Sequence, residues 1–109
     1  MTEPKLDFEL PELETLSLEQ FAEGVVLLKL NRPDRMNSQT VRMFHEYGIV
    51  AKTLRDSSAR ALIVTGAGDR AFCAGFDTAE IGVLTGLGTR EFLKFMETAA
   101  GGVAGIRQL

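Results

Sequence analysis

The chain has 109 residues, of which 45% are hydrophobic and 25% charged, and its formal net charge is −3. This length and composition are typical of one globular domain or less. An acidic balance with scattered lysine and arginine argues against nucleic acid or a membrane surface as a partner. The single cysteine, Cys73, excludes an internal disulfide. Because the N-terminus also lacks the apolar stretch of a secretory signal, we expect a cytoplasmic protein.

The first 30 residues predict an acidic, extended lead-in and a β-hairpin. The lead-in is residues 1–13. Residues 15–21 alternate between polar and apolar side chains, and Val25–Leu30 is a short apolar run. The Glu23-Gly24 pair between them is a turn signal, so the two runs are expected to pair. Pro33 then breaks the chain.

A helix and a further strand follow the hairpin. Apolar residues at helical spacing predict a helix over about 39–55, with Asn37 or Ser38 as its cap and its charged side chains, including Glu46, on a solvated face. Residues 60–65 (RALIVT) predict a second buried strand. A strand–helix–strand crossover implies a parallel pair covered by the helix, which places the chain in the α/β class.

The second half begins with glycine turns and ends in a helix. Asp77 and Glu80 have the spacing of a capping box, in which Asp77 caps a helix and Glu80 reaches back. The glycines that follow predict that this helix is short or irregular. Residues 89–109 predict a longer helix, which Gly101 and Gly102 should weaken by about 1 kcal/mol each.

The stretch AFCAGFD, residues 71–77, places its smallest side chains between a strand and a helix start. One interpretation is a tight connection with an aspartate cap. The other uses the same geometry for chemistry, because free N–H groups at a helix start can stabilise the oxyanion of a thioester or ester carbonyl. The residues alone do not separate these two interpretations.

Three further signals favour structural roles. Residues 66–71 (GAGDRA) fit a loose dinucleotide pattern, but no helix cap follows until Asp77, so a plain turn is favoured. His45 is the only histidine and has no cluster of metal ligands around it, so we predict no metal site. Cys73 lacks an activating base and is interpreted as a small buried hydrophobe.

Two segments stand out when they are taken together: residues 25–44 (VVLLKLNRPDRMNSQTVRMF) and residues 60–81 (RALIVTGAGDRAFCAGFDTAEI). In this order they resemble the crotonase superfamily, the enoyl-CoA hydratase/isomerase family. The first is similar to the family's first strand, Asn-Arg-Pro turn and first helix, and the second to its next strand, glycine turn and Ala-Gly-x-Asp segment. The resemblance implies a crotonase-like ββα spiral, incomplete in this chain, of which residues 1–109 are the N-terminal portion.

The resemblance also implies a site. Ala74 matches the position whose backbone N–H is one of two oxyanion-hole donors, and Gly75, Phe76 and Asp77 match the rest of the acyl-CoA-binding segment. The turn formed by Asp34, Arg35 and Met36 matches the one that lies along the coenzyme A moiety. Coenzyme A is then part of the substrate, and no separate cofactor is expected.

The family's second oxyanion donor and its acid/base carboxylates match no residue up to Leu109. We therefore expect the full-length protein to be an enoyl-CoA hydratase or isomerase and the 109-residue chain alone to be inactive. The alternative is a truncated, non-catalytic module that binds acyl-CoA or assembles with a partner. The resemblance further implies a homo-oligomer, either a trimer or a hexamer.

Overall fold

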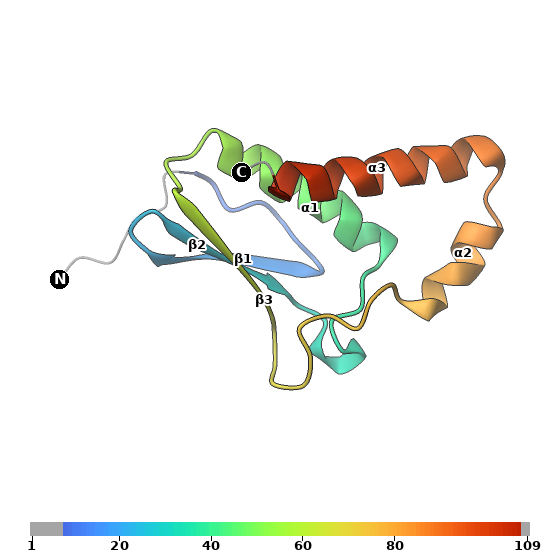
Figure 1. Cartoon of the computed structure of the whole chain (residues 1–109), viewed down its shortest axis with the longest axis horizontal. Helices are drawn as coiled ribbons and strands as arrows, with labels where there is room; N and C mark the ends of the chain where they lie inside the picture. Colours follow the sequence, from blue (N-terminus) through green and yellow to red (C-terminus); the bar gives the residue numbers. More distant parts are fainter. Residues whose placement is uncertain (1–7, 108–109) are drawn as a thin grey trace.

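The computed structural model describes residues 8–107, which form a small sheet with helices on one side (Figure 1). The strands are β1 (Leu16–Ala22), β2 (Val25–Leu30) and β3 (Ala61–Gly66). The α-helices are α1 (Val41–Arg55), α2 (Ile81–Thr85) and α3 (Thr89–Arg107), and two 3-10 helices are η1 (Pro33–Arg35) and η2 (Thr78–Glu80). The predicted hairpin, crossover and long helices are all present. Two predicted segments lie partly outside the described residues: the lead-in at residues 1–7 and the last helix at residues 108–109.

The sheet order is β1-β2-β3, so β2 is the central strand. β1 pairs with β2 in antiparallel register, and β2 pairs with β3 in parallel register. α1 connects β2 to β3, as the strand–helix–strand pattern predicted. Parallel strands joined in this way bring their carboxyl ends to the same edge of the sheet, and the chain segments that leave β2 and β3 there are the ones that resemble the crotonase site.

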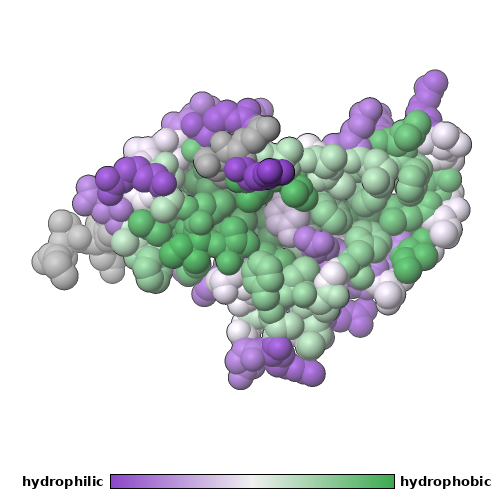
Figure 2. Space-filling view, in the orientation of Figure 1, coloured by the Kyte–Doolittle hydropathy of each residue, from purple (hydrophilic) through white to green (hydrophobic). Residues whose placement is uncertain are grey.

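The core lies between one face of the sheet and α1. Alternate residues of β1 and β2 point into it, and α1 contributes the stripe that faces them: Leu16, Leu18, Val26, Leu28, Leu30, Met43, Tyr47, Val50 and Leu54. The prediction that 60–65 form a buried strand is wrong for the described chain. β3 is an edge strand, and Ile63 and Val64 are 41% and 38% exposed. Apolar surface accordingly gathers around β3 in Figure 2.

The predicted cap of α1 and the predicted place of Glu46 on its solvated face are both wrong. Its cap is Thr40, whose side chain accepts a hydrogen bond from the Met43 N–H, and neither Asn37 nor Ser38 caps it. Glu46, predicted on the solvated face, is fully buried. Its carboxylate accepts hydrogen bonds from the N–H groups of residues 14, 15 and 16 and from Arg42 Nε. Glu46 therefore fastens the start of β1 to α1.

The bonds to Glu46 set its ionisation. Burial would raise the pKa of this carboxyl, but the backbone N–H donors of Glu14 and Thr15, with Arg42 and the Thr15 hydroxyl, outweigh burial and lower it. The side chain is thus held as a carboxylate in the interior. A surface-charge interpretation of α1 misses this role because the donors lie about 30 residues earlier in the sequence.

α3 lies alongside α1 and touches it through glycines (Figure 1). Gly102 and Gly105 are the buried residues of α3. A Cβ atom at Gly102 would lie 2.6 Å from the Phe44 carbonyl oxygen, and one at Gly105 would lie 2.8 Å from Ala51 Cβ. Gly102, predicted to weaken this helix, is therefore what allows its close approach.

The predicted capping box is half correct. Asp77 caps η2 by accepting a hydrogen bond from the Ala79 N–H. Glu80 does not reach back to Asp77, because its Oε1 atom accepts a hydrogen bond from the Val41 N–H at the start of α1.

Between residues 8 and 107, no helix has both the length and the apolar content that crossing a membrane requires.

Candidate acyl-CoA site

Two segments that leave the carboxyl ends of β2 and β3 run side by side, and we call this contact the seam (Figure 1). It joins residues 36–41 to residues 74–80. Its three backbone hydrogen bonds are Ala74 N to Met36 O at 3.0 Å, Gln39 N to Gly75 O at 2.7 Å and Asp77 N to Gln39 O at 2.8 Å. The seam thus brings together the two stretches that the sequence predicted to bind coenzyme A.

Asn37 holds the turn on the β2 side of the seam. Its side chain is 1% exposed, and its Oδ1 atom accepts a hydrogen bond from the Arg32 N–H at 2.9 Å. Its Nδ2 group donates to the carbonyl oxygens of Ala67 and Ala71. Met36 and Asn37 both have left-handed backbone angles, φ 57° and 54°. Such a turn is strained for residues other than glycine, and the buried amide of Asn37 offsets that strain.

Asp77 holds the other side of the seam. Its Oδ1 atom accepts from the Ala79 N–H at 2.8 Å, and its Oδ2 atom accepts from the Ser38 hydroxyl and pairs with Arg32 Nη1 at 3.0 Å. The Ala79 N–H and then the Arg32 guanidinium lower the pKa of this carboxyl, against a smaller opposing effect of burial. The carboxylate that the sequence placed in the acyl-CoA segment is therefore engaged inside the fold.

The predicted oxyanion donor is not free. The Ala74 N–H already donates to Met36 O, so in this structure it has no hydrogen left for a ligand. The Phe76 N–H differs from that of Ala74. Gln39 forms a parallel bridge opposite Phe76, in which its backbone hydrogen bonds go to Gly75 and Asp77, the neighbours of Phe76. In such a bridge the intervening N–H points away from the partner strand. Within residues 8–107 nothing accepts the Phe76 N–H.

The backbone and side chain of Phe76 are both fixed. The preceding Gly75 has φ +103°, a left-handed angle that favours glycine. The Phe76 ring stacks on Phe44 of α1, with centroids 6.2 Å apart, and lies 6.4 Å from Phe95 of α3. Contacts with α1 and α3 therefore hold the ring, and the bridge to Gln39 holds the backbone that carries the N–H.

Most of the predicted binding residues share one cavity. It measures about 340 Å³ and is lined by Asp34, Arg35, Met36, Ser38, Ala74, Phe76, Asp77 and Thr78. These include every predicted acyl-CoA contact except Gly75. Asp34 and Arg35 are exposed on η1 at the rim, where a guanidinium is accessible to an anionic group. The sequence prediction did not include Ser38, which lines this cavity, or Arg32, which pairs with Asp77. Arg32 lies in the Asn-Arg-Pro turn, and no local pattern marks Ser38 for this role.

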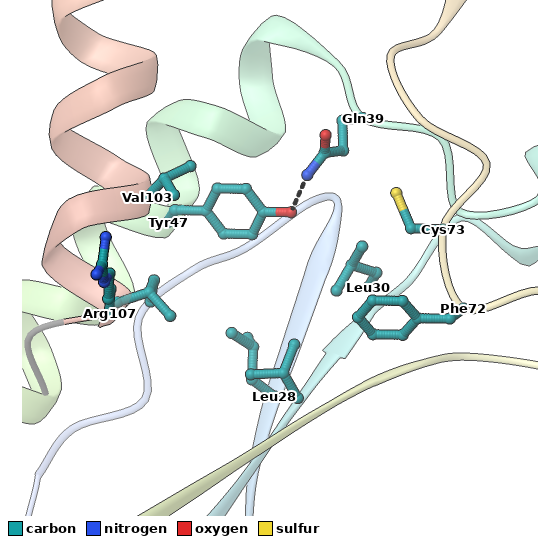
Figure 3. Close-up of a pocket in the computed structure, with 10 residues that line it drawn as sticks. Leu28, Leu30, Gln39, Tyr47, Phe72, Cys73, Val103 and Arg107 are labelled. Carbon is teal, nitrogen blue, oxygen red and sulfur yellow. Dashed lines mark hydrogen bonds between the residues drawn. The ribbon is translucent and has the colours of Figure 1, made fainter.

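A second cavity, of about 280 Å³, is lined in part by the loop that contains Cys73 (Figure 3). Its lining is largely apolar and includes Leu28, Leu30, Phe72 and Val103. Gln39, Tyr47 and Arg107 are its polar members, and the Tyr47 hydroxyl accepts a hydrogen bond from Gln39 Nε2 at 2.9 Å. Burial is the main cause that raises the pKa of Tyr47. Cys73 is only half-buried at this wall, so the predicted burial of its side chain is partial.

Solved structures share this arrangement. An enoyl-CoA hydratase from Mycobacterium smegmatis superposes with a TM-score of 0.75 at 30% sequence identity, over 88% of this chain and 37% of that one. Pseudomonas aeruginosa AtuE superposes with a TM-score of 0.75 at 33% identity, over 84% of this chain and 35% of that one. The sheet and helices of this chain therefore have the crotonase fold.

Sequence comparison gives the same family. The enoyl-CoA hydratase/isomerase family model matches residues 20–92. The 1,2-epoxyphenylacetyl-CoA isomerase of Escherichia coli is 44% identical over 61 residues, which are 55% of this chain and 23% of that protein. The mitochondrial 3-hydroxyisobutyryl-CoA hydrolase of Danio rerio is 41% identical over 56 residues, 50% of this chain and 15% of that protein. The chain belongs to the enoyl-CoA hydratase/isomerase family, and it spans about a quarter of the length of such relatives.

Proposed function

We propose that this chain forms the acyl-CoA-binding part of an enzyme of the hydratase/isomerase type, in which the Phe76 N–H polarises a thioester carbonyl. One observation carries the proposal. Phe76 presents an N–H group without a partner among the described residues, from a backbone that is fixed on both sides, at the cavity that the family-like segments line. A fixed, unpaired donor is what the stabilisation of a developing oxyanion requires.

The chemistry follows from polarisation of the carbonyl. A hydrogen bond to the thioester oxygen makes the α-proton more acidic and the β-carbon more electrophilic, so hydration and double-bond isomerisation both become easier. The names of the relatives include an isomerase, hydratases and a hydrolase, so similarity to them does not select one reaction. The exposed Arg35 at the cavity rim is the residue that we assign to a phosphate of coenzyme A.

We propose that the rest of the catalytic machinery is absent from these 109 residues. Asp77 and Glu80, the acidic side chains nearest to the Phe76 N–H along the chain, are both engaged by hydrogen bonds inside the fold. This supports the alternative as well, a non-catalytic acyl-CoA-binding or assembly module. A homo-oligomer, trimer or hexamer, and a cytoplasmic location remain proposals, the latter supported by the single cysteine.

The test compares two substitutions at Phe76 in the full-length protein. Phe76→Pro removes the N–H, whereas Phe76→Leu keeps it and removes only the aromatic ring. With acyl-CoA thioesters as substrates, beginning with crotonyl-CoA, we expect Phe76→Pro to lower kcat/KM by about 100- to 1,000-fold. The leucine control should stay much closer to the wild type. If a Phe76→Pro protein with native circular dichroism keeps full turnover, this assignment is refuted.

A further inference from the structure

Asp77 is where the bonds of the seam converge. Its N–H donates to Gln39 O immediately after Phe76, so it closes the bridge that turns the Phe76 N–H outward. Its carboxylate reaches back across the seam to Ser38 and Arg32. The backbone and the side chain of Asp77 therefore both hold the chain directly after the peptide that carries the proposed donor.

Arg32 completes the arrangement from the other side. Its Nη1 group lies 3.0 Å from Asp77 Oδ2 and also donates to the Ser38 carbonyl at 2.7 Å and hydroxyl at 2.9 Å. Its side chain is 19% exposed and that of Asp77 is 10% exposed, so water screens this ion pair little. The pair Lys29–Glu19 on the sheet is a contrast, because both of its side chains are well exposed.

We propose that Asp77 is a positioning residue: held by Arg32 and Ser38, it fixes the direction of the Phe76 N–H toward the substrate carbonyl. The inference rests on the proposed function. A donor must lie about 2.7–3.1 Å from the oxyanion, and a misplacement of about 1 Å can cost about 100-fold in rate. Without the carboxylate, the backbone bond to Gln39 remains, but nothing ties the 76–77 peptide to Arg32 and Ser38.

Asp77→Asn in the full-length protein tests the role, because it keeps the size of the side chain and an oxygen for the Ala79 N–H. We expect kcat to fall by about 10- to 100-fold while KM changes by less than about threefold. The second readout is optical. A conjugated enoyl-CoA bound to the wild type should show a red-shifted absorbance, since a hydrogen bond polarises its carbonyl, and Asp77→Asn should lose most of that shift.

Two further variants separate positioning from folding. Glu19→Gln removes the exposed ion pair with Lys29 and should leave kcat and the absorbance shift unchanged. Arg32→Met combined with Asp77→Asn removes both charges of the buried pair, so it should recover stability relative to Asp77→Asn without recovering kcat or the shift.

Each result has one meaning. If Asp77→Asn, correctly folded, retains the kcat and the absorbance shift of the wild type, the positioning role is wrong and the proposed function stands. If the double variant recovers kcat together with stability, Asp77 acts only through folding. If the wild type neither turns over nor shifts any acyl-CoA thioester, the proposed function fails, and the positioning role fails with it.

Discussion

Alanine at Gly102 should destabilise the protein, while the same change one residue earlier should stabilise it. Both glycines lie in the interior of α3, so each substitution gains about 0.5–1 kcal/mol of helix propensity. They differ in what a new methyl group meets. At Gly101 nothing lies within 4 Å, whereas at Gly102 the methyl carbon would lie 2.6 Å from the Phe44 carbonyl oxygen and 3.2 Å from Tyr47 Cβ.

The difference between the two variants isolates the packing cost. A backbone oxygen cannot rotate away, so α3 must move off α1, and such overpacking costs about 1–3 kcal/mol. Because the propensity gain is common to both variants, Gly102→Ala should have a free energy of unfolding lower than that of Gly101→Ala by this amount. Urea denaturation followed by far-ultraviolet circular dichroism measures it. Equal stability of the two variants would show that α3 does not approach α1 as closely as the structure has it.

Two further predictions use Glu46 and the isolated chain. Glu46→Gln should lower the free energy of unfolding by about 1–3 kcal/mol, because an amide cannot accept every N–H that the carboxylate accepts. Folding lowers the pKa of Glu46, so the ionised carboxylate stabilises the folded state fully above the reference pKa of 4.5. This stabilisation is lost as the pH falls through the lower pKa of the folded state. The free energy of unfolding of Glu46→Gln should therefore lack this loss in an acid titration. Residues 1–109 alone should show no crotonyl-CoA hydration, and turnover above about 1 per second would contradict this. The isolated chain should also associate in light scattering, because Ile63, Val64 and Phe72 are exposed. A sharp monomer peak would contradict that second expectation.

Local patterns were sufficient for the elements of the fold. Alternation in β1, the apolar run of β2 and the helical spacing in α1 each reflect contacts with one neighbouring layer. The connection between β2 and β3 is long enough to hold the crossover helix that a parallel pair needs. Those features were therefore predictable from the sequence.

Features that depend on distant partners were not. The burial of Glu46 depends on N–H groups about 30 residues away. The need for glycine at position 102 depends on the nearby Phe44 carbonyl oxygen of another helix. The donor that we propose, Phe76, lies two residues after the predicted one for the same reason. Whether Ala74 or Phe76 has a free N–H is decided by the register of the seam with Gln39, and no local pattern in AFCAGFD contains that register.

The seam also makes ligand binding and folding parts of one equilibrium. Its partners are separated by more than 30 residues, so the cavity exists only while both segments are docked. A ligand that fills the cavity then stabilises the docked state, by about 2.7 kcal/mol at a concentration 100 times its Kd. Hydrogen exchange at the Gln39 and Asp77 amides should consequently slow when an acyl-CoA is added, which makes these two amides reporters of occupancy that need no turnover.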